Sequence, residues 1–238
     1  MIREHKQPGG NTPLPPFSEN LVFWAPLTQG DLSDHISGEV GASSSNCSAV
    51  WDSTEGMYLL TAATTDTYGR GYNSDALRYN SSTLRANLNG TQTTGMTVYM
   101  LLKEHTYVPG TNGQYGVSRY FSCSTMYDVW ETSPRMNVLV DGTRLRQSSI
   151  NTTKLWRTAV VYNPTSKLIT IYDVDSGTQV LSGSWTDTPA APLSVGLCSK
   201  NGHGTSTTSG YNTKSFSAYV QDVRIYNRQL TASEIAHL

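Results

Sequence analysis

The stretch Phe216-Ser-Ala-Tyr-Val-Gln-Asp-Val-Arg-Ile-Tyr226 decides the fold of this chain of 238 residues. Up to Val220, apolar residues occupy every second position, which is typical of a β-strand that buries one face. The apolar positions then shift, beginning with Val223. A shift of this kind predicts a β-bulge near Gln221 or Asp222, because one extra residue exchanges the two faces of the strand.

A single short helix is predicted directly after this strand. Thr231-Ala-Ser-Glu234 is a capping box, in which Thr231 caps the first helical turn and Glu234 reaches back to the amide of the cap residue. Ahead of this strand the chain is predicted to form short strands separated by turns, and Asp141-Gly142 suits the tight turn of a hairpin. The clearest strands are the apolar runs at 21–27, 96–103, 136–140, 154–162 and 167–173. The last two runs are predicted to form a hairpin, because only a four-residue loop separates them.

The composition agrees with a protein made mostly of strands. Charged residues make up 15% of the chain, whereas Ser and Thr number 28 and 30. Such hydroxyl-rich, weakly charged sequences favour strands and polar loops over helices. We therefore expect an all-β fold, a two-sheet antiparallel jelly-roll sandwich over residues 18–238 with one short C-terminal helix.

Residues 1–17 form a separate segment that is rich in proline and glycine. Because the segment has few apolar side chains, it cannot bury enough surface to offset the entropy of ordering it. We therefore expect an extended N-terminal arm. Two placements are open: the arm packs on its own domain, or it docks on another chain, in a homo-oligomer or in a virion.

The end of the chain also carries a family resemblance. Tyr219-Val-Gln-Asp-Val-Arg-Ile-Tyr-Asn-Arg-Gln-Leu-Thr-Ala-Ser-Glu-Ile235 resembles the last strand and trailing helix of laminin-G-like, concanavalin A-like domains. The stretches 20–27, 155–163 and 192–196 resemble earlier strands of that superfamily, in the same order. The resemblance implies two curved antiparallel sheets over residues 20–238. It implies no single function, because the fold serves lectins, glucanases, adhesion modules and virion parts alike.

Glycoside hydrolysis is the enzymatic alternative that this resemblance raises. The reaction needs two facing carboxylates, and hydrolases of the superfamily resemble one another in a Glu-x-Asp-x-Glu strand that this chain lacks. Asp173-Val-Asp175 runs into a turn, and Asp128 and Glu131 would fall on opposite faces of a strand. The five histidines have no metal-ligand spacing. We therefore predict a protein that is not an enzyme and has no catalytic residue.

Residues suited to binding a sugar are better represented in the sequence than residues suited to catalysis. Sugars are bound by aromatic faces with amide or hydroxyl groups nearby, and each aromatic could instead cover a sheet as a half-buried ring. The candidate ligand-binding residues are Tyr68, Tyr72, Tyr115, Tyr120, Tyr127, Trp130 and Tyr211. No cofactor is required. Calcium is common in the superfamily, and the acidic residues that could bind it are Asp31, Asp34, Asp66 and Asp75.

Charge and hydropathy exclude several partners. A net charge of −1 gives no electrostatic footprint for nucleic acid, and the sequence has no apolar run of 18 residues that could cross a membrane. No secretory signal is recognisable, so we expect synthesis in the cytoplasm and incorporation into a virion or another extracellular assembly. The predicted function is a non-catalytic recognition or structural module of a surface-exposed assembly, such as a bacteriophage virion, with capacity to bind polysaccharide. A free-standing carbohydrate-binding lectin or adhesion protein is the alternative.

Overall fold

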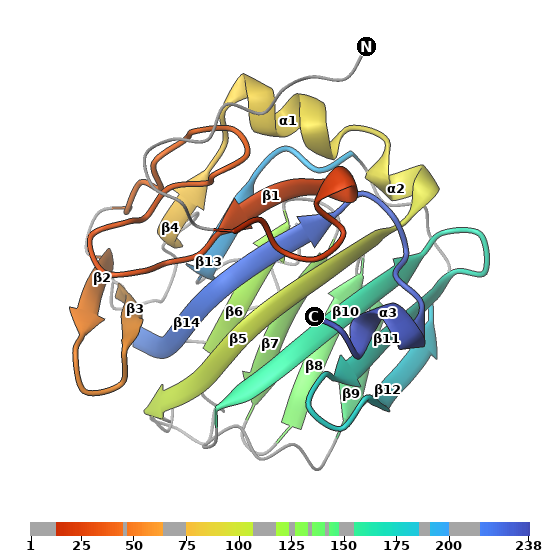
Figure 1. Cartoon of the computed structure of the whole chain (residues 1–238). Coiled ribbons are helices and arrows are strands. Elements are labelled where there is room, and N and C mark those ends of the chain that lie inside the picture. Colours follow the sequence, from red (N-terminus) through yellow and green to blue (C-terminus); the bar gives the residue numbers. More distant parts are fainter. Residues whose placement is uncertain are drawn as a thin grey trace.

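In the computed structural model of the chain, two antiparallel β-sheets face each other across a hydrophobic core (Figure 1). The structure describes residues 13–44, 47–63, 75–106, 118–123, 127–132, 135–140, 143–147, 155–185, 191–199 and 215–238. Within these residues, the larger sheet has eight strands and the smaller sheet has six. This arrangement confirms the predicted all-β fold and its two-sheet sandwich.

The order of strands in each sheet differs from their order in the sequence, because the chain passes repeatedly between the sheets. Across the larger sheet lie β12 (Thr178–Ser184), β11 (Leu168–Asp173), β10 (Trp156–Asn163), β5 (Met96–Thr106), β14 (Ser215–Tyr226), β3 (Met57–Ala63) and β2 (Cys47–Asp52), and β1 (Leu21–Ala25) pairs with β14. Across the smaller sheet lie β4 (Asp75–Tyr79), β13 (Val195–Ser199), β6 (Ser118–Cys123), β7 (Tyr127–Thr132), β8 (Arg135–Val140) and β9 (Thr143–Gln147).

Strand β14, which the sequence singled out, joins several strands of the larger sheet. Its first half pairs with β3 and its second half with β1, while β5 pairs with it along the other side. The pairing with β5 shifts in register between Gln221 and Arg224, and Asp222 has a φ of 50°. The predicted bulge is therefore confirmed, and it allows Val220 and Val223 both to face the core.

In the described part of the chain, two short α-helices add to the predicted one, α1 (Ser82–Leu88) and α2 (Thr91–Thr94), and a 3₁₀ helix, η1 (Ser18–Asn20), precedes β1. The hydroxyl of Ser81 caps α1 by accepting a hydrogen bond from the amide of Leu84 at 3.2 Å, and Leu84 and Leu88 are buried. Two leucines four residues apart are too short a pattern to predict a helix from sequence. None of the helices in the described part of the chain has the length and apolar character that crossing a bilayer requires.

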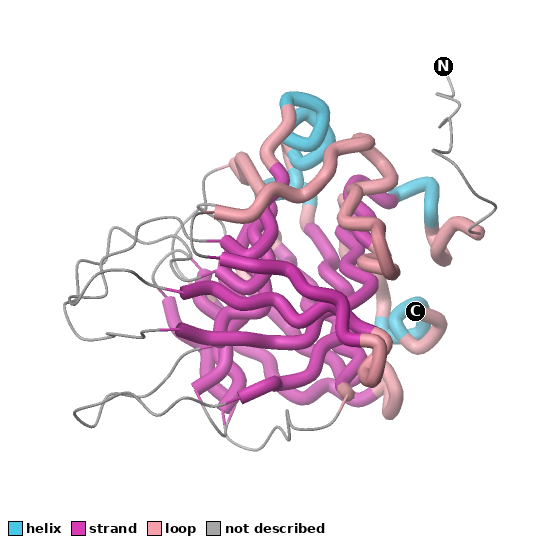
Figure 2. The backbone as a smooth tube through the Cα atoms, turned by 90° about the vertical axis from the view of Figure 1, so that its left-hand side faces the viewer, coloured by secondary structure: helices cyan, strands magenta, loops and turns pink. Residues whose placement is uncertain are grey.

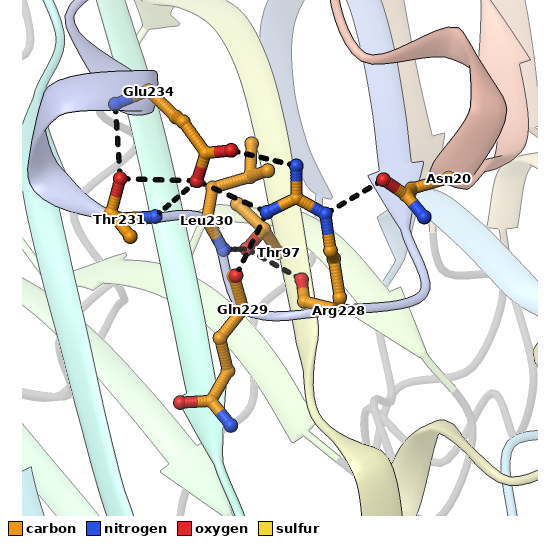
Figure 3. Close-up of polar contacts among 7 residues, drawn as sticks. All are labelled: Asn20, Thr97, Arg228, Gln229, Leu230, Thr231 and Glu234. Carbon is orange, nitrogen blue, oxygen red and sulfur yellow. Dashed lines mark hydrogen bonds and ion pairs between the residues drawn. The ribbon is translucent and has the colours of Figure 1, made fainter.

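The predicted C-terminal helix is α3 (Ala232–Ile235), and its capping box is present. The amide of Thr231 donates to the carboxylate of Glu234 at 2.8 Å, and the Thr231 hydroxyl accepts from the amide of Glu234 at 3.3 Å (Figure 3). Glu234 also accepts two hydrogen bonds from the guanidinium of Arg228, which donates in turn to Asn20 at 2.7 Å. The end of the chain is thereby tied to the residue that precedes β1.

Of the predicted N-terminal arm, the structure describes residues 13–17. Pro15 is buried, and the ring centroid of Phe17 lies 5.6 Å from the guanidinium carbon of Arg228. Phe17 also packs against the apolar cluster on the outer face of the larger sheet. Residues 1–12, on which the docking prediction mainly rests, lie outside the described residues.

Candidate functional site

One end of the sandwich, which we call the loop end, collects strand ends from both sheets. In the larger sheet, Ser215 at the start of β14 pairs with Ala63 at the end of β3, and β5 ends close by at Thr106. In the smaller sheet, Ser199 at the end of β13 pairs with Asp75 at the start of β4. Strand β6 begins at the same end, because it runs antiparallel to β13.

Three segments join strands at the loop end: 64–74 between β3 and β4, 107–117 between β5 and β6, and 200–214 between β13 and β14. The strand ends next to these segments lie on the left of Figure 2. The segments themselves lie outside the described residues, and they contain the candidates Tyr68, Tyr72, Tyr115, Tyr211 and Asp66. The topology therefore brings together the attachment points of three stretches that are distant in sequence.

Four further candidates lie in strands of the smaller sheet. Asp75 is the first residue of β4, and Tyr120 lies two residues into β6, so both are at the loop end. Trp130 of β7 pairs with the residue of β6 that precedes Tyr120. Tyr127 is separated from this group, because it pairs with Cys123 at the opposite end of β6.

The predicted calcium ligand Asp34 organises the loop that follows β1. This residue is fully buried. Its two oxygens accept four hydrogen bonds, from the amides of Trp24, Ile36 and Ser37 and from the Ser37 hydroxyl. Burial raises the pKa of Asp34, and these hydrogen bonds oppose the rise. Because four hydrogen bonds use all the lone-pair positions of a carboxylate, Asp34 does not fit a calcium site.

Asp31 also makes its contacts within this loop. It accepts a hydrogen bond from the amide of Ser33 at 2.9 Å, and its other oxygen lies 2.6 Å from Nε2 of His35. Burial alone would raise the pKa of Asp31, but the hydrogen bonds from His35 and Ser33 lower it. Among the residues that the structure describes, no three His, Cys, Asp or Glu side chains form a group that could hold a metal ion. A calcium site at Asp66 and Asp75 stays a prediction.

The acidic pairs that come nearest to a hydrolase motif, Asp173 with Asp175 and Asp128 with Glu131, lie in a turn and in a strand. Asp173 accepts hydrogen bonds from the amide of Asp175 at 3.1 Å and from the hydroxyl of Ser176 at 2.9 Å, which confirms the predicted turn. In β7, Asp128 and Glu131 are three residues apart and so lie on opposite faces of the strand.

Sequence reasoning missed a buried ion pair on the outer face of the larger sheet. Arg224 is 9% exposed and donates to Asp222 from Nε at 2.9 Å and from Nη2. The guanidinium carbon of Arg224 lies 4.6 Å from the ring centroid of Tyr99. Asp222 also accepts a hydrogen bond from the indole of Trp24 at 3.1 Å. The residue at the bulge of β14 thus holds β1 against β14.

No model of a protein family matches this chain, and no curated protein matches it by sequence. Solved structures do match. The binding domain of botulinum neurotoxin DC in complex with rat synaptotagmin II is similar over 92% of this chain and 50% of its own, with a TM-score of 0.62 and 7% identity. A structure reporting that cell entry of botulinum neurotoxin type C depends on two ganglioside molecules matches over 92% and 50%, with a TM-score of 0.61 and 9% identity. The receptor-binding domain of botulinum neurotoxin type G matches over 91% and 50%, with a TM-score of 0.60 and 11% identity.

At these identities the likeness shows the fold alone. This chain spans about half the length of the solved structures it matches, so what each whole domain binds is not assigned to the matched half. The likeness supports a β-rich sandwich of the kind that receptor-binding domains contain. The laminin-G-like, concanavalin A-like assignment stays a resemblance.

Proposed function

We propose that this chain is a non-catalytic glycan-recognition module of a surface-exposed assembly, such as a bacteriophage virion. The observation that carries the proposal is the loop end, where the segments 64–74, 107–117 and 200–214 attach to neighbouring strands. These segments hold Tyr68, Tyr72, Tyr115 and Tyr211 among many hydroxyl and amide residues. Aromatic rings that stack on sugars, with polar groups nearby for the sugar hydroxyls, are the chemistry of carbohydrate binding.

Two further observations support a binding role. Loops held by a rigid scaffold are where binding residues concentrate, and here strands of both sheets hold the loop end. Solved structures of the same fold include toxin binding domains, one of them reported with a dependence on gangliosides. The described acidic residues support a non-catalytic role, because Asp34 and Asp173 accept hydrogen bonds that shape loops.

A glycan array probed with the full chain tests the proposal. We expect binding that weakens about tenfold in Tyr72→Ala and in Tyr211→Ala, because a lost stacking contact of about 1.4 kcal/mol is a factor of ten in affinity. Tyr72→Phe and Tyr211→Phe are the matched controls, since they keep the ring. Absence of binding to every glycan, or full affinity in both alanine variants, overturns the proposal. Release of reducing sugar from a bound polysaccharide overturns its non-catalytic part.

The proposed place in an assembly rests on the N-terminal arm. An extended segment of 12 residues reaches up to about 40 Å, which is enough to lie on a neighbouring chain and add a strand to a sheet edge. We expect deletion of residues 1–12 to leave the circular-dichroism spectrum of the domain unchanged and to lower the mass of the assembly measured by light scattering. An unchanged mass overturns the docking role and leaves the glycan proposal standing.

A further inference from the structure

Strand β2 lies at one edge of the larger sheet. In the described part of the chain it pairs with β3 alone, and Figure 1 shows it at the left margin of the sheet. The outward peptide groups of an edge strand can pair with a strand of another chain. Proteins commonly prevent such pairing with a charged residue, a proline or a bulge in the edge strand.

The first five residues of β2, Cys-Ser-Ala-Val-Trp, include neither a charged residue nor a proline. The pairing with β3 keeps one register from Cys47 to Asp52, without a bulge. Val50 is 56% exposed, and Ser48 is also exposed. Trp51 is half-buried and packs against the core. An exposed valine beside a half-buried indole gives this edge apolar surface that a protein interface would bury.

The other edge strands in the described part of the chain differ from β2. Strand β9 contains Arg144 and Arg146. Strand β4 contains Arg78, which is bridged by Ala42 from outside the named strands. The exposed residues of β12 are all polar: Thr178, Gln179, Ser182 and Ser184. Strand β2 is therefore the edge where pairing would bury an exposed apolar side chain without bringing arginines together.

Two copies of β2 suit antiparallel pairing with each other. Residues paired directly across antiparallel strands share a face, so a two-fold axis through such a pair places one residue opposite itself. With the axis at Val50, the two Val50 side chains face each other. Ala49 then lies opposite Trp51, a small side chain against a large one. Ser48 lies opposite Asp52, a hydroxyl donor against a carboxylate, and no like charges meet.

Asp52 has room for one more hydrogen bond. Its Oδ1 accepts from the amides of Thr54 at 2.9 Å and Glu55 at 3.3 Å, and its Oδ2 accepts from the hydroxyl of Tyr219 at 2.8 Å. A carboxylate offers about four lone-pair positions. The fourth position, on Oδ2, is available to the Ser48 hydroxyl of a second copy.

We propose that two copies of this chain associate through β2, in an antiparallel pair centred on Val50 that joins their larger sheets into one. Because the same edge is used in both copies, the contact closes at two chains. The inference goes beyond the proposed function, since the contact needs neither a glycan nor the N-terminal arm.

Sedimentation equilibrium of the full chain, at concentrations up to its solubility limit, tests the contact. At equal concentration we expect Val50→Lys to have half the mass of the wild type, because two lysines would face each other at the axis. Val40→Lys is the matched control and should keep the wild-type mass, since Val40 is 65% exposed and lies outside β2. A wild type that stays at the 26.0 kDa of one chain overturns the inference. Equal masses in the two lysine variants also overturn it, and a mass that falls only on deletion of residues 1–12 assigns association to the arm instead.

A disulfide tests the register without adding a charge. Directly opposed residues have Cβ atoms about 4.5–5.5 Å apart, close to the separation of about 3.5–4.5 Å in a disulfide. Oxidised glutathione, which is reduced to two thiols as it takes up the two electrons and two protons, should therefore link Val50→Cys into a covalent pair of chains on non-reducing electrophoresis. Val40→Cys, the control, should stay a single chain. Absence of the covalent pair in Val50→Cys, or an equal yield in Val40→Cys, overturns the inference.

Discussion

Replacing Asp222 by asparagine is expected to destabilise the fold, because Asp222 neutralises the buried guanidinium of Arg224. The substitution keeps the size and shape of the side chain and removes its charge. Asp222 has a φ of 50°, and asparagine adopts the left-handed conformation about as readily as aspartate. The amide oxygen of asparagine can still accept the hydrogen bond from the indole of Trp24, which Asp222 accepts at 3.1 Å. What disappears is the negative charge beside Arg224 and the oxygen that accepts from its Nη2, because an NH2 group takes the place of that oxygen.

The expected cost follows from burial. Removing one partner of a buried ion pair costs about 3–5 kcal/mol. The side chain of Arg224 is 11% exposed and that of Asp222 is 25% exposed. The carbonyl of Leu238 and the ring of Tyr99 remain beside the guanidinium at 3.4 Å and 4.6 Å. We therefore take the lower limit, about 3 kcal/mol, which lowers Tm by about 6–12 °C in a chain of this length.

Urea unfolding followed by circular dichroism measures the free energy of unfolding of each variant. Asp175→Asn is the matched control: Asp175 pairs with Arg157 at 3.1 Å, but the two side chains are 55% and 38% exposed. An exposed pair of this kind contributes about 0–1 kcal/mol. If Asp222→Asn costs no more than Asp175→Asn, the reasoning from the buried charge is refuted.

Two further predictions concern the C-terminal capping box and Gly95, the residue at which α2 ends. The hydrogen bond from Arg228 lowers the pKa of Glu234 from 4.5 to about 2, so the stability that the ionised carboxylate contributes is complete above pH 4.5 and is lost as the pH falls through 2. Unfolding free energies at pH 6 and pH 2 should show the wild-type advantage over Glu234→Gln at pH 6 alone, and an equal advantage at both would contradict this. Gly95 has a φ of 107°, and a Cβ there would lie 3.1 Å from the carbonyl oxygen of Tyr162. Thermal unfolding should therefore show a larger loss for Gly95→Ala than for Gly30→Ala, which has a φ of 80° and no atom within 4 Å; equal losses would show that the close approach costs nothing.

Features that depend on neighbours in sequence were predictable. The capping box of α3 needs residues three apart, the bulge at Asp222 follows from a change in alternation, and the hairpin of β10 and β11 follows from two apolar runs with a short turn between them. All three are confirmed, the last by the pairing of Asn163 with Leu168. Helix α1 was missed, because two buried leucines are too short a pattern and because Glu39, which accepts hydrogen bonds from the amides of Asn80 and Ser81, lies far from the helix in sequence.

The candidate site was also predictable only in part from the sequence. The composition of the loops pointed to Tyr68, Tyr72 and Tyr211 as ligand-binding candidates, which stay predictions. Nothing local indicated that their segments attach at one end of the sandwich. Without the register, no residue could be matched to its neighbour across the sheet.

Local patterns in the amino-acid sequence were enough to predict the strands β1, β5, β8, β10, β11 and β14, the bulge of β14 and the start of the last helix. These properties depend on the alternation of apolar residues and on hydrogen bonds between residues a few positions apart. Only the tertiary fold places β14 between β5 and β3 and brings the strand ends that flank three distant segments to one end of the sandwich. The physical reason is that alternation assigns each residue a face, whereas its neighbour on that face depends on which pairing of strands buries the apolar faces of both sheets together.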